Sequence, residues 1–206
     1  MGLFSDLTLG LFDSPPWDRP TYWALDLETG GLDAKGDPIL AVGMVPIRDG
    51  VLRLGQAYRT LVRPETGGRI DPDTVRVHQI LWGELQEAPP IEAVLPEIEA
   101  RLRGSVMLVH YAAVDVAFLK RAFRRAGLKW PSPPVVDTAR LLRRIAEHAH
   151  PELPTDMAPR NLGRARRAHG LPEYQAHDAL TDAIATGELF LVLRKELGAR
   201  TLRDLT

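Results

Sequence analysis

The chain has 206 residues, enough for one domain with a sizeable core. It is 45% hydrophobic and 26% charged, as soluble globular proteins are, and its net charge of −1 gives no overall attraction to nucleic acid. The absence of cysteine excludes disulfides, thiolate metal sites and a cysteine nucleophile. The longest apolar run, residues 39–47, is too short to span a bilayer, and no basic residue precedes Arg19 as a secretory signal requires. We therefore expect a cytoplasmic protein without a membrane partner.

The hydrophobic pattern predicts strands first and then alternating helices and strands. Strand-like segments span about 21–28, 38–47 and 51–63, and the turn "RDG" joins the last two into a hairpin. Later strands are expected at about 105–110 and 133–136, and helices at about 91–103, 114–127, 138–149, 160–171 and 178–197. This order predicts an α/β fold with a mixed five-stranded sheet, one antiparallel hairpin and flanking helices. Residues 1–20, with the breaker-rich "DSPPWDRP", are predicted to be a flexible leader, 21–197 the domain and 198–206 a C-terminal tail.

Two acids lie inside the first predicted strand, "TYWALDLETGG". Asp26 and Glu28 are two residues apart, so their side chains leave the same face of the sheet, while the apolar residues take the other. The glycine pair at 30–31 ends the strand and places both acids near its C-terminal edge, where open α/β sheets usually bind ligands. An exposed polar face on an edge strand would give the same pattern, and this segment alone does not decide between the two.

Two further acids lie on helical apolar stripes. Asp115 precedes Phe118 and Leu119 by about one turn, although it could also cap that helix. Asp182 lies one turn inside the last helix, which Asp178 can cap, and by itself a solvent-facing position fits it better. Taken together with the strand acids, these carboxylates suit Mg²⁺ or Mn²⁺, which prefer oxygen ligands. Two such ions can clamp the attacking and leaving oxygens of a phosphoryl displacement.

His177 adds a titratable group to this set. It lies five residues before Asp182, and its unperturbed pKa of about 6.5 lets it accept a proton from an attacking water at neutral pH. A single histidine is more often structural or solvated, so the functional interpretation of His177 depends on its spacing from Asp182.

Three motifs in order resemble the DEDDh exonucleases, the DnaQ-like family that includes the proofreading epsilon subunit of bacterial replicative DNA polymerase. "ALDLETGGL" carries Asp26 and Glu28, "LVHYAAVDVAFL" carries Asp115, and "HDALTDAIATGELF" carries His177 and Asp182. "VRVHQI", residues 75–80, is similar to the family's segment near the substrate. The resemblance spans roughly residues 21–195.

This resemblance implies an RNase H-like fold and hydrolysis with two Mg²⁺ or Mn²⁺ ions from the 3′ end of single-stranded or frayed DNA. The products would be nucleoside 5′-monophosphates, as in repair or proofreading. Asp26, Glu28, Asp115 and Asp182 would bind the metals, and His177 would be the general base. A tyrosine at position 178 would mark the sister subgroup, and Asp178 indicates the histidine type. An exoribonuclease or oligoribonuclease, or a binding module for a polymerase or clamp, are the alternatives.

Substrate contacts are also implied by family position. The chain has His110–Tyr111 where the family commonly has His-Asn, and Gln79 in place of the glycine of "VHGI", and both could reshape contacts to the terminal nucleotide. Phe118 could pack beneath a base, with a core position as the alternative. The full set of candidate substrate contacts is Thr29, Leu32, Asp73, His78, Tyr111 and Phe118.

Two surface features could bind larger partners. Arg160, Arg164, Arg166 and Arg167 could form a track for a nucleic-acid backbone, although a charge cluster is more often a solvated face. "TLGLF", Thr8–Phe12, resembles the short peptides by which bacterial replication proteins dock on the sliding clamp. Packing of these residues on their own domain is the alternative.

Overall fold

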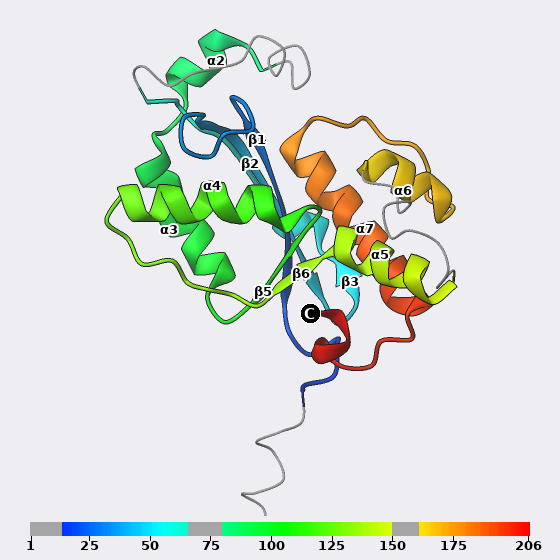
Figure 1. Ribbon diagram of the computed structural model, residues 1–206. Helices are drawn as coiled ribbons and strands as arrows, with labels where there is room; N and C mark the ends of the chain where they lie inside the picture. The colour runs from blue at the N-terminus through cyan, green and yellow to red at the C-terminus, as the bar shows by residue number, and fades with distance from the viewer. Residues whose placement is uncertain (1–13, 66–79, 150–160) are drawn as a thin grey trace, which may run out of the picture.

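The computed structural model describes residues 14–65, 80–149 and 161–206, and is built around one mixed sheet (Figure 1). The strand order is β3-β2-β1-β5-β6, and β4 also pairs with β2. Strand β1 is antiparallel to β2 and parallel to β5, which is parallel to β6. The strands are β1 (Tyr22–Thr29), β2 (Ile39–Arg48), β3 (Val51–Leu52), β4 (Tyr58–Leu61), β5 (Val106–Val109) and β6 (Val135–Asp137).

The mixed α/β sheet predicted from the sequence is confirmed, with six strands where five were expected. The difference lies in the segment 51–63, which was expected to be one strand. A 3₁₀ turn, η1 (Leu54–Gln56), divides it into β3 and β4, and both pair antiparallel with β2. The apolar alternation is interrupted at this turn by "LGQ", and all three residues are exposed.

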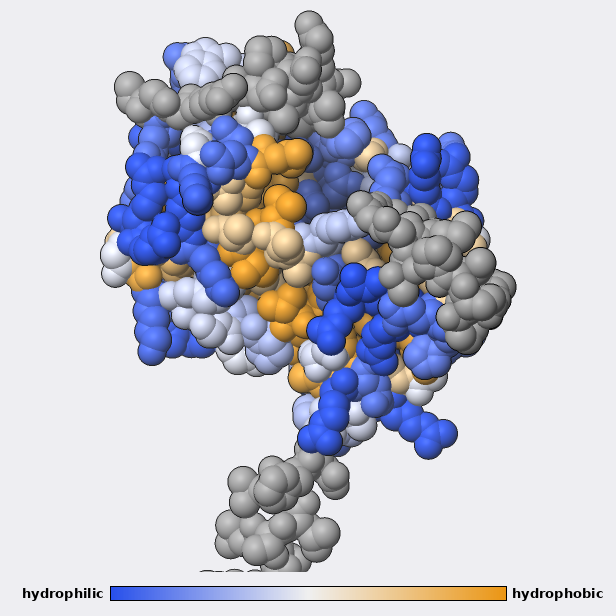
Figure 2. Space-filling view, viewed as in Figure 1, coloured by the Kyte–Doolittle hydropathy of each residue, from blue (hydrophilic) through white to orange (hydrophobic). Residues whose placement is uncertain are grey.

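Helices cover both faces of the sheet (Figure 1). Helices α3 and α4 lie on one face and α5, α6 and α7 on the other. Hydrophobic surface on the face shown gathers between α4 and α5, and the outer helix surfaces are largely hydrophilic (Figure 2). The helices are α2 (Trp82–Glu87), which was not predicted, α3 (Ile91–Leu102), α4 (Ala112–Arg125), α5 (Thr138–Ala149), α6 (Leu162–Ala168) and α7 (Ala179–Glu196).

The alternation of β1 builds both halves of the core. Tyr22 and Ala24 pack on the α7 side, while Trp23 and Leu25 pack on the α3 and α4 side. Asp26, next in the alternation after Ala24, therefore points toward the α7 side, and Glu28 shares this face by the same alternation.

The first and last described segments pack together. Pro16 forms a β-bridge with Thr201, and the guanidinium of Arg194 lies 3.9 Å from the centre of the Trp17 ring. Leu205, in the 3₁₀ helix η3 (Leu202–Leu205), is buried.

Residues 1–13 lie outside the described chain, so the domain limits remain a prediction. Among the described residues, none of the helices combines the length and the apolar character needed to cross a membrane.

Gly43 allows α7 to approach the sheet closely. It pairs with Asp26 across the β1–β2 ladder, and a Cβ on Gly43 would lie 2.2 Å from backbone atoms of Ala179 at the start of α7. Any larger residue at this position would therefore push the first turn of α7 away. Because that turn carries Asp182, the glycine in β2 helps to bring the acids of β1 and α7 together.

Candidate active site

Three acids meet at the C-terminal end of β1. One carboxylate oxygen from each of Asp26, Glu28 and Asp182 can be chosen so that all lie within 4.8 Å of one another. Asp26 and Glu28 come from β1 and are partly buried, and Asp182 comes from the first turn of α7 and is buried. The sequence placed Asp182 on an apolar helix face but favoured solvent when that helix was judged alone. The structure buries it against the sheet.

Asp115 approaches the same end of β1 from the other side. It is 5% exposed, in the first turn of α4, which follows β5, the parallel neighbour of β1. The N-cap of α4 is Tyr111, so the alternative that Asp115 caps this helix is wrong. The backbones of Asp115 itself and of Leu27, in β1, both favour the ionised carboxylate and lower its pKa, so the side chain lies beside β1.

The environment of these acids disfavours their ionised forms. Burial raises the pKa of Asp26 well above its ordinary range, and the charges of Asp115, Asp182 and Glu28 raise it further. Burial, followed by the charges of Asp182 and Asp178, raises the pKa of Glu28 to about 7. Burial is also the main cause that raises the pKa of Asp115 to about 8. A divalent cation would relieve this repulsion, and an all-oxygen donor set fits Mg²⁺ or Mn²⁺.

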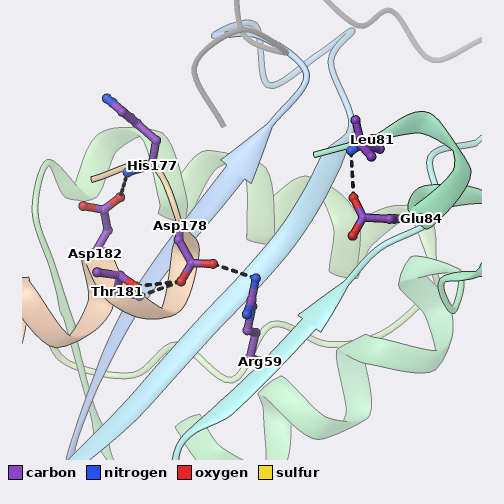
Figure 3. A network of polar contacts seen from close by, with 7 residues as sticks. All are labelled: Arg59, Leu81, Glu84, His177, Asp178, Thr181 and Asp182. Carbon is purple, nitrogen blue, oxygen red and sulfur yellow. Dashed lines mark hydrogen bonds and ion pairs between the residues drawn. The ribbon is translucent and has the colours of Figure 1, made fainter. Parts of the chain in front are cut away.

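Asp182 is held at both carboxylate oxygens. The hydroxyl of Tyr174 donates to Oδ1 at 2.5 Å, and the backbone N–H of His177 donates to Oδ2 at 2.7 Å. Burial and the Asp182 charge raise the pKa of Tyr174 well above its ordinary range, so the hydroxyl remains a donor. His177 has a left-handed backbone, with φ of 71°, and its exposed side chain points away from the Asp182 carboxylate (Figure 3).

Asp178 caps α7, as the sequence predicted. Its Oδ1 accepts from the backbone N–H of Thr181 at 3.0 Å and from its hydroxyl at 2.9 Å, while Oδ2 pairs with Arg59 at 2.7 Å (Figure 3). Arg59 lies on β4, far from Asp178 in the sequence, so local patterns do not reveal this pair. The ion pair ties the start of α7, next to His177, to that strand.

Two cavities open on either side of the His177 segment. One, of about 360 Å³, is lined by residues that include Asp26, His110 and Asp182. The other, of about 240 Å³, is lined by residues that include Glu28 and Arg59. His177 borders both cavities, which lie beside the acids.

The candidate substrate residues divide into four groups. Leu32 is 84% exposed and Tyr111 is 37% exposed at the start of α4, so both present surface to a ligand. The hydroxyl of Thr29 donates to the carbonyl of Gly31 at 2.6 Å, which shapes the turn after β1. Phe118 is only 2% exposed and belongs to the core, the alternative that the sequence left open. Asp73 and His78 lie outside the described residues.

The predicted arginine track is wrong for one member. Arg166 is 2% exposed and pairs with Glu188 at 2.7 Å, so it is a buried structural cation. Arg164 and Arg167 are exposed, with Arg167 paired to Glu173 at 3.1 Å. Arg160 lies outside the described residues, as does the predicted clamp peptide at 8–12. A run of arginines in the sequence does not reveal which one turns inward.

Comparison with known proteins now identifies the family. The family model RNase_T, described as exonuclease, matches residues 23–190. The chain belongs to this exonuclease family. The resemblance to DnaQ-like exonucleases predicted from the three motifs is thereby confirmed.

Two curated relatives illustrate the match. The chain is 34% identical over 188 residues to a DNA polymerase III subunit epsilon-like protein of Rhodobacter capsulatus, covering 91% of this chain and 25% of the relative. It is 28% identical over 172 residues to the 3′-5′ exonuclease DinG of Staphylococcus aureus, covering 84% of this chain and 18% of that protein. The chain thus spans about a quarter or less of the length of these two relatives.

A solved structure confirms the fold. The chain resembles exonuclease I of E. coli, determined as a complex with single-stranded DNA, with a TM-score of 0.74 and 18% sequence identity. The alignment covers 87% of this chain and 41% of that one. At this level of identity the likeness supports the RNase H-like fold, and the chemistry must be argued from the residues themselves.

Proposed function

We propose that this exonuclease-family domain is a two-metal-ion 3′-5′ exonuclease that acts on single-stranded or frayed DNA and releases nucleoside 5′-monophosphates. The observation that carries the proposal is the convergence of Asp26, Glu28 and Asp182 within 4.8 Å, with His177 hydrogen-bonded through its backbone to Asp182. The names of relatives, a 3′-5′ exonuclease and an epsilon-like protein, support the direction of hydrolysis and a role in repair or proofreading.

Asp26, Glu28, Asp115 and Asp182 would hold the divalent ions, Mg²⁺ or Mn²⁺. When bound, such ions neutralise charge that develops on the phosphate and lower the pKa of water. The acids come from one strand and two helices, so their positions depend on the packed core rather than on a loop. Rigid elements of this kind keep ligands in place with little reorganisation.

His177 would take the proton of the water that attacks the scissile phosphorus. The new P–O bond forms as the bond from phosphorus to the 3′ oxygen of the preceding nucleotide breaks. That oxygen keeps the electron pair and takes a proton from solvent, and the terminal nucleotide leaves with a 5′ phosphate. His177 suits this role because its side chain is exposed and borders both cavities beside the acids. Its backbone hydrogen bond to Asp182 would hold His177 at a fixed position relative to the metal ligands.

Single-stranded substrate is supported by the exposed apolar groups beside the site and by the DNA bound to the structural relative. Leu32 and Tyr111 could contact the terminal nucleotide, and an aromatic ring offers a stacking surface for any base. Association with a polymerase or a sliding clamp through residues 8–12, and a cytoplasmic location, are part of the proposal that the described residues do not test.

The test is digestion of 5′-labelled single-stranded DNA, and RNA of the same sequence, with Mg²⁺ or Mn²⁺. We expect a ladder of shortened labelled DNA, and release of labelled mononucleotide at the start would indicate the opposite polarity. Asp182→Asn should abolish cleavage, and His177→Ala should lower the rate by roughly 10²–10⁴-fold while metal still binds. His148→Ala, which changes an exposed histidine at the end of α5, is the matched control and should cleave normally.

Two other outcomes of this digestion would contradict the proposal. Faster digestion of RNA than of DNA would turn the proposal to an exoribonuclease. Failure to digest either strand with both metals would favour a binding module for a polymerase or clamp.

A further inference from the structure

Arg166 ties the connection between α6 and α7 to α7 itself. Its Nη1 donates to the carbonyl of Ala185 at 2.9 Å and to Glu188 at 2.7 Å, both on α7. Its Nη2 donates to the carbonyl of Pro172, in the connection, at 3.2 Å. A buried guanidinium is costly unless it is paired, so its fixed contacts determine where this backbone can lie. These contacts hold the connection close to Asp182, because Ala185 lies about one turn after Asp182 in α7.

Tyr174 links this arginine to the acid. Its ring centre lies 4.8 Å from the guanidinium carbon of Arg166, and its hydroxyl donates to Oδ1 of Asp182 at 2.5 Å. The tyrosine is therefore held at its ring by one partner and at its hydroxyl by the other. The same connection supplies the N–H of His177 that bonds to Oδ2, so both oxygens of Asp182 are oriented from one short segment.

We propose that Tyr174, held in place by Arg166, is a positioning residue that presets the Asp182 carboxylate for a divalent cation and thereby raises the affinity of the acid set. The inference rests on the proposed function, because it assumes that Asp182 is a ligand. A carboxylate has about four lone-pair sites, so two hydrogen bonds orient it and leave sites for a cation. Partners that hydrogen-bond a ligand in this way typically contribute about 10–100-fold to metal affinity.

The experiment measures Mn²⁺ binding to the full chain without nucleic acid, by the electron paramagnetic resonance signal of free Mn²⁺. Tyr174→Phe should weaken Mn²⁺ binding by about tenfold or more, because only the hydroxyl is removed. Tyr22→Phe is the matched control, since the Tyr22 hydroxyl donates to the carbonyl of Trp17, also at 2.5 Å, at the opposite end of β1. It should bind Mn²⁺ as the unaltered chain does, even if its melting temperature falls.

Arg166→Lys gives a second test through the other partner. Lysine keeps a positive charge near Glu188 but lacks the planar fork that contacts both Pro172 and the Tyr174 ring. It should weaken Mn²⁺ binding in the same direction as Tyr174→Phe. If Arg166→Lys does not fold, Tyr174→Phe alone tests the proposal. If Tyr174→Phe does not fold, Arg166→Lys alone tests it.

The outcomes separate this inference from the proposed function. If the unaltered chain binds Mn²⁺, Asp182→Asn loses it, and Tyr174→Phe binds as tightly as the unaltered chain, the positioning role is overturned and the metal site stands. A lower melting temperature without weaker binding would likewise overturn it, because it would indicate a merely structural tyrosine. If the unaltered chain binds no Mn²⁺, the proposed metal site itself is wrong and this inference falls with it.

Discussion

Replacing Glu28 with glutamine removes one charge from the acid cluster and should stabilise the metal-free protein at high pH. The pKa of Glu28 is raised from 4.5 to about 7, so between these values the folded chain binds more protons than the unfolded chain. Stability therefore falls as pH rises through this window. At pH 8 the ionised side chain costs the folded state about 3 kcal/mol, and at pH 5 about 1 kcal/mol. Partial exposure of Glu28 lowers the expected gain at pH 8 to about 2 kcal/mol.

The assay is urea unfolding of the unaltered chain and of Glu28→Gln in EDTA at pH 5 and pH 8. The variant should gain more at pH 8, because glutamine has no proton to lose there. Glu147→Gln, at an exposed position on α5, is the control and should change the free energy of unfolding by less than about 0.5 kcal/mol at both pH values. An equal gain at both pH values, or none at pH 8, would refute the view that repulsion and burial destabilise the ionised cluster.

Three further predictions concern the packing and charge around the site. Gly43→Ala places a Cβ 2.2 Å from the backbone of α7 and should destabilise by about 3 kcal/mol, whereas Gly55→Ala has open space and serves as its control in thermal unfolding. Asp178→Ala should cost about 1 kcal/mol through the lost cap, while Asp178→Asn, which can still cap but cannot pair with Arg59, should cost less; equal losses would contradict this division. Mn²⁺ should raise the melting temperature more at pH 8 than at pH 5.5, because its ligands must be deprotonated, and a pH-independent increase would argue against binding at these acids.

Local patterns in the sequence predicted most of the order of elements, apart from α2 and the division of the third strand, and the ligand candidates. Period-two alternation in β1 placed Asp26 and Glu28 on one face, and the cap at Asp178 placed Asp182 one turn inside α7. Both features depend on neighbours a few residues away, which is why they can be read without the fold. The third strand was harder to predict, because only a short 3₁₀ turn with a single glycine, Gly55, divides it.

Long-range packing decided the rest. Arg166 belongs to a run of basic residues that would suit a solvent-exposed surface, yet the partners that bury it lie on α7, about twenty residues later. Tyr174 carries no motif, and its role depends on a hydroxyl that meets Asp182 only when the α6–α7 connection folds back. The sequence by itself determined which side chains could carry the chemistry, because residue type and spacing are local. Only the tertiary structure decided how those side chains are held, because their partners come from segments that folding brings together.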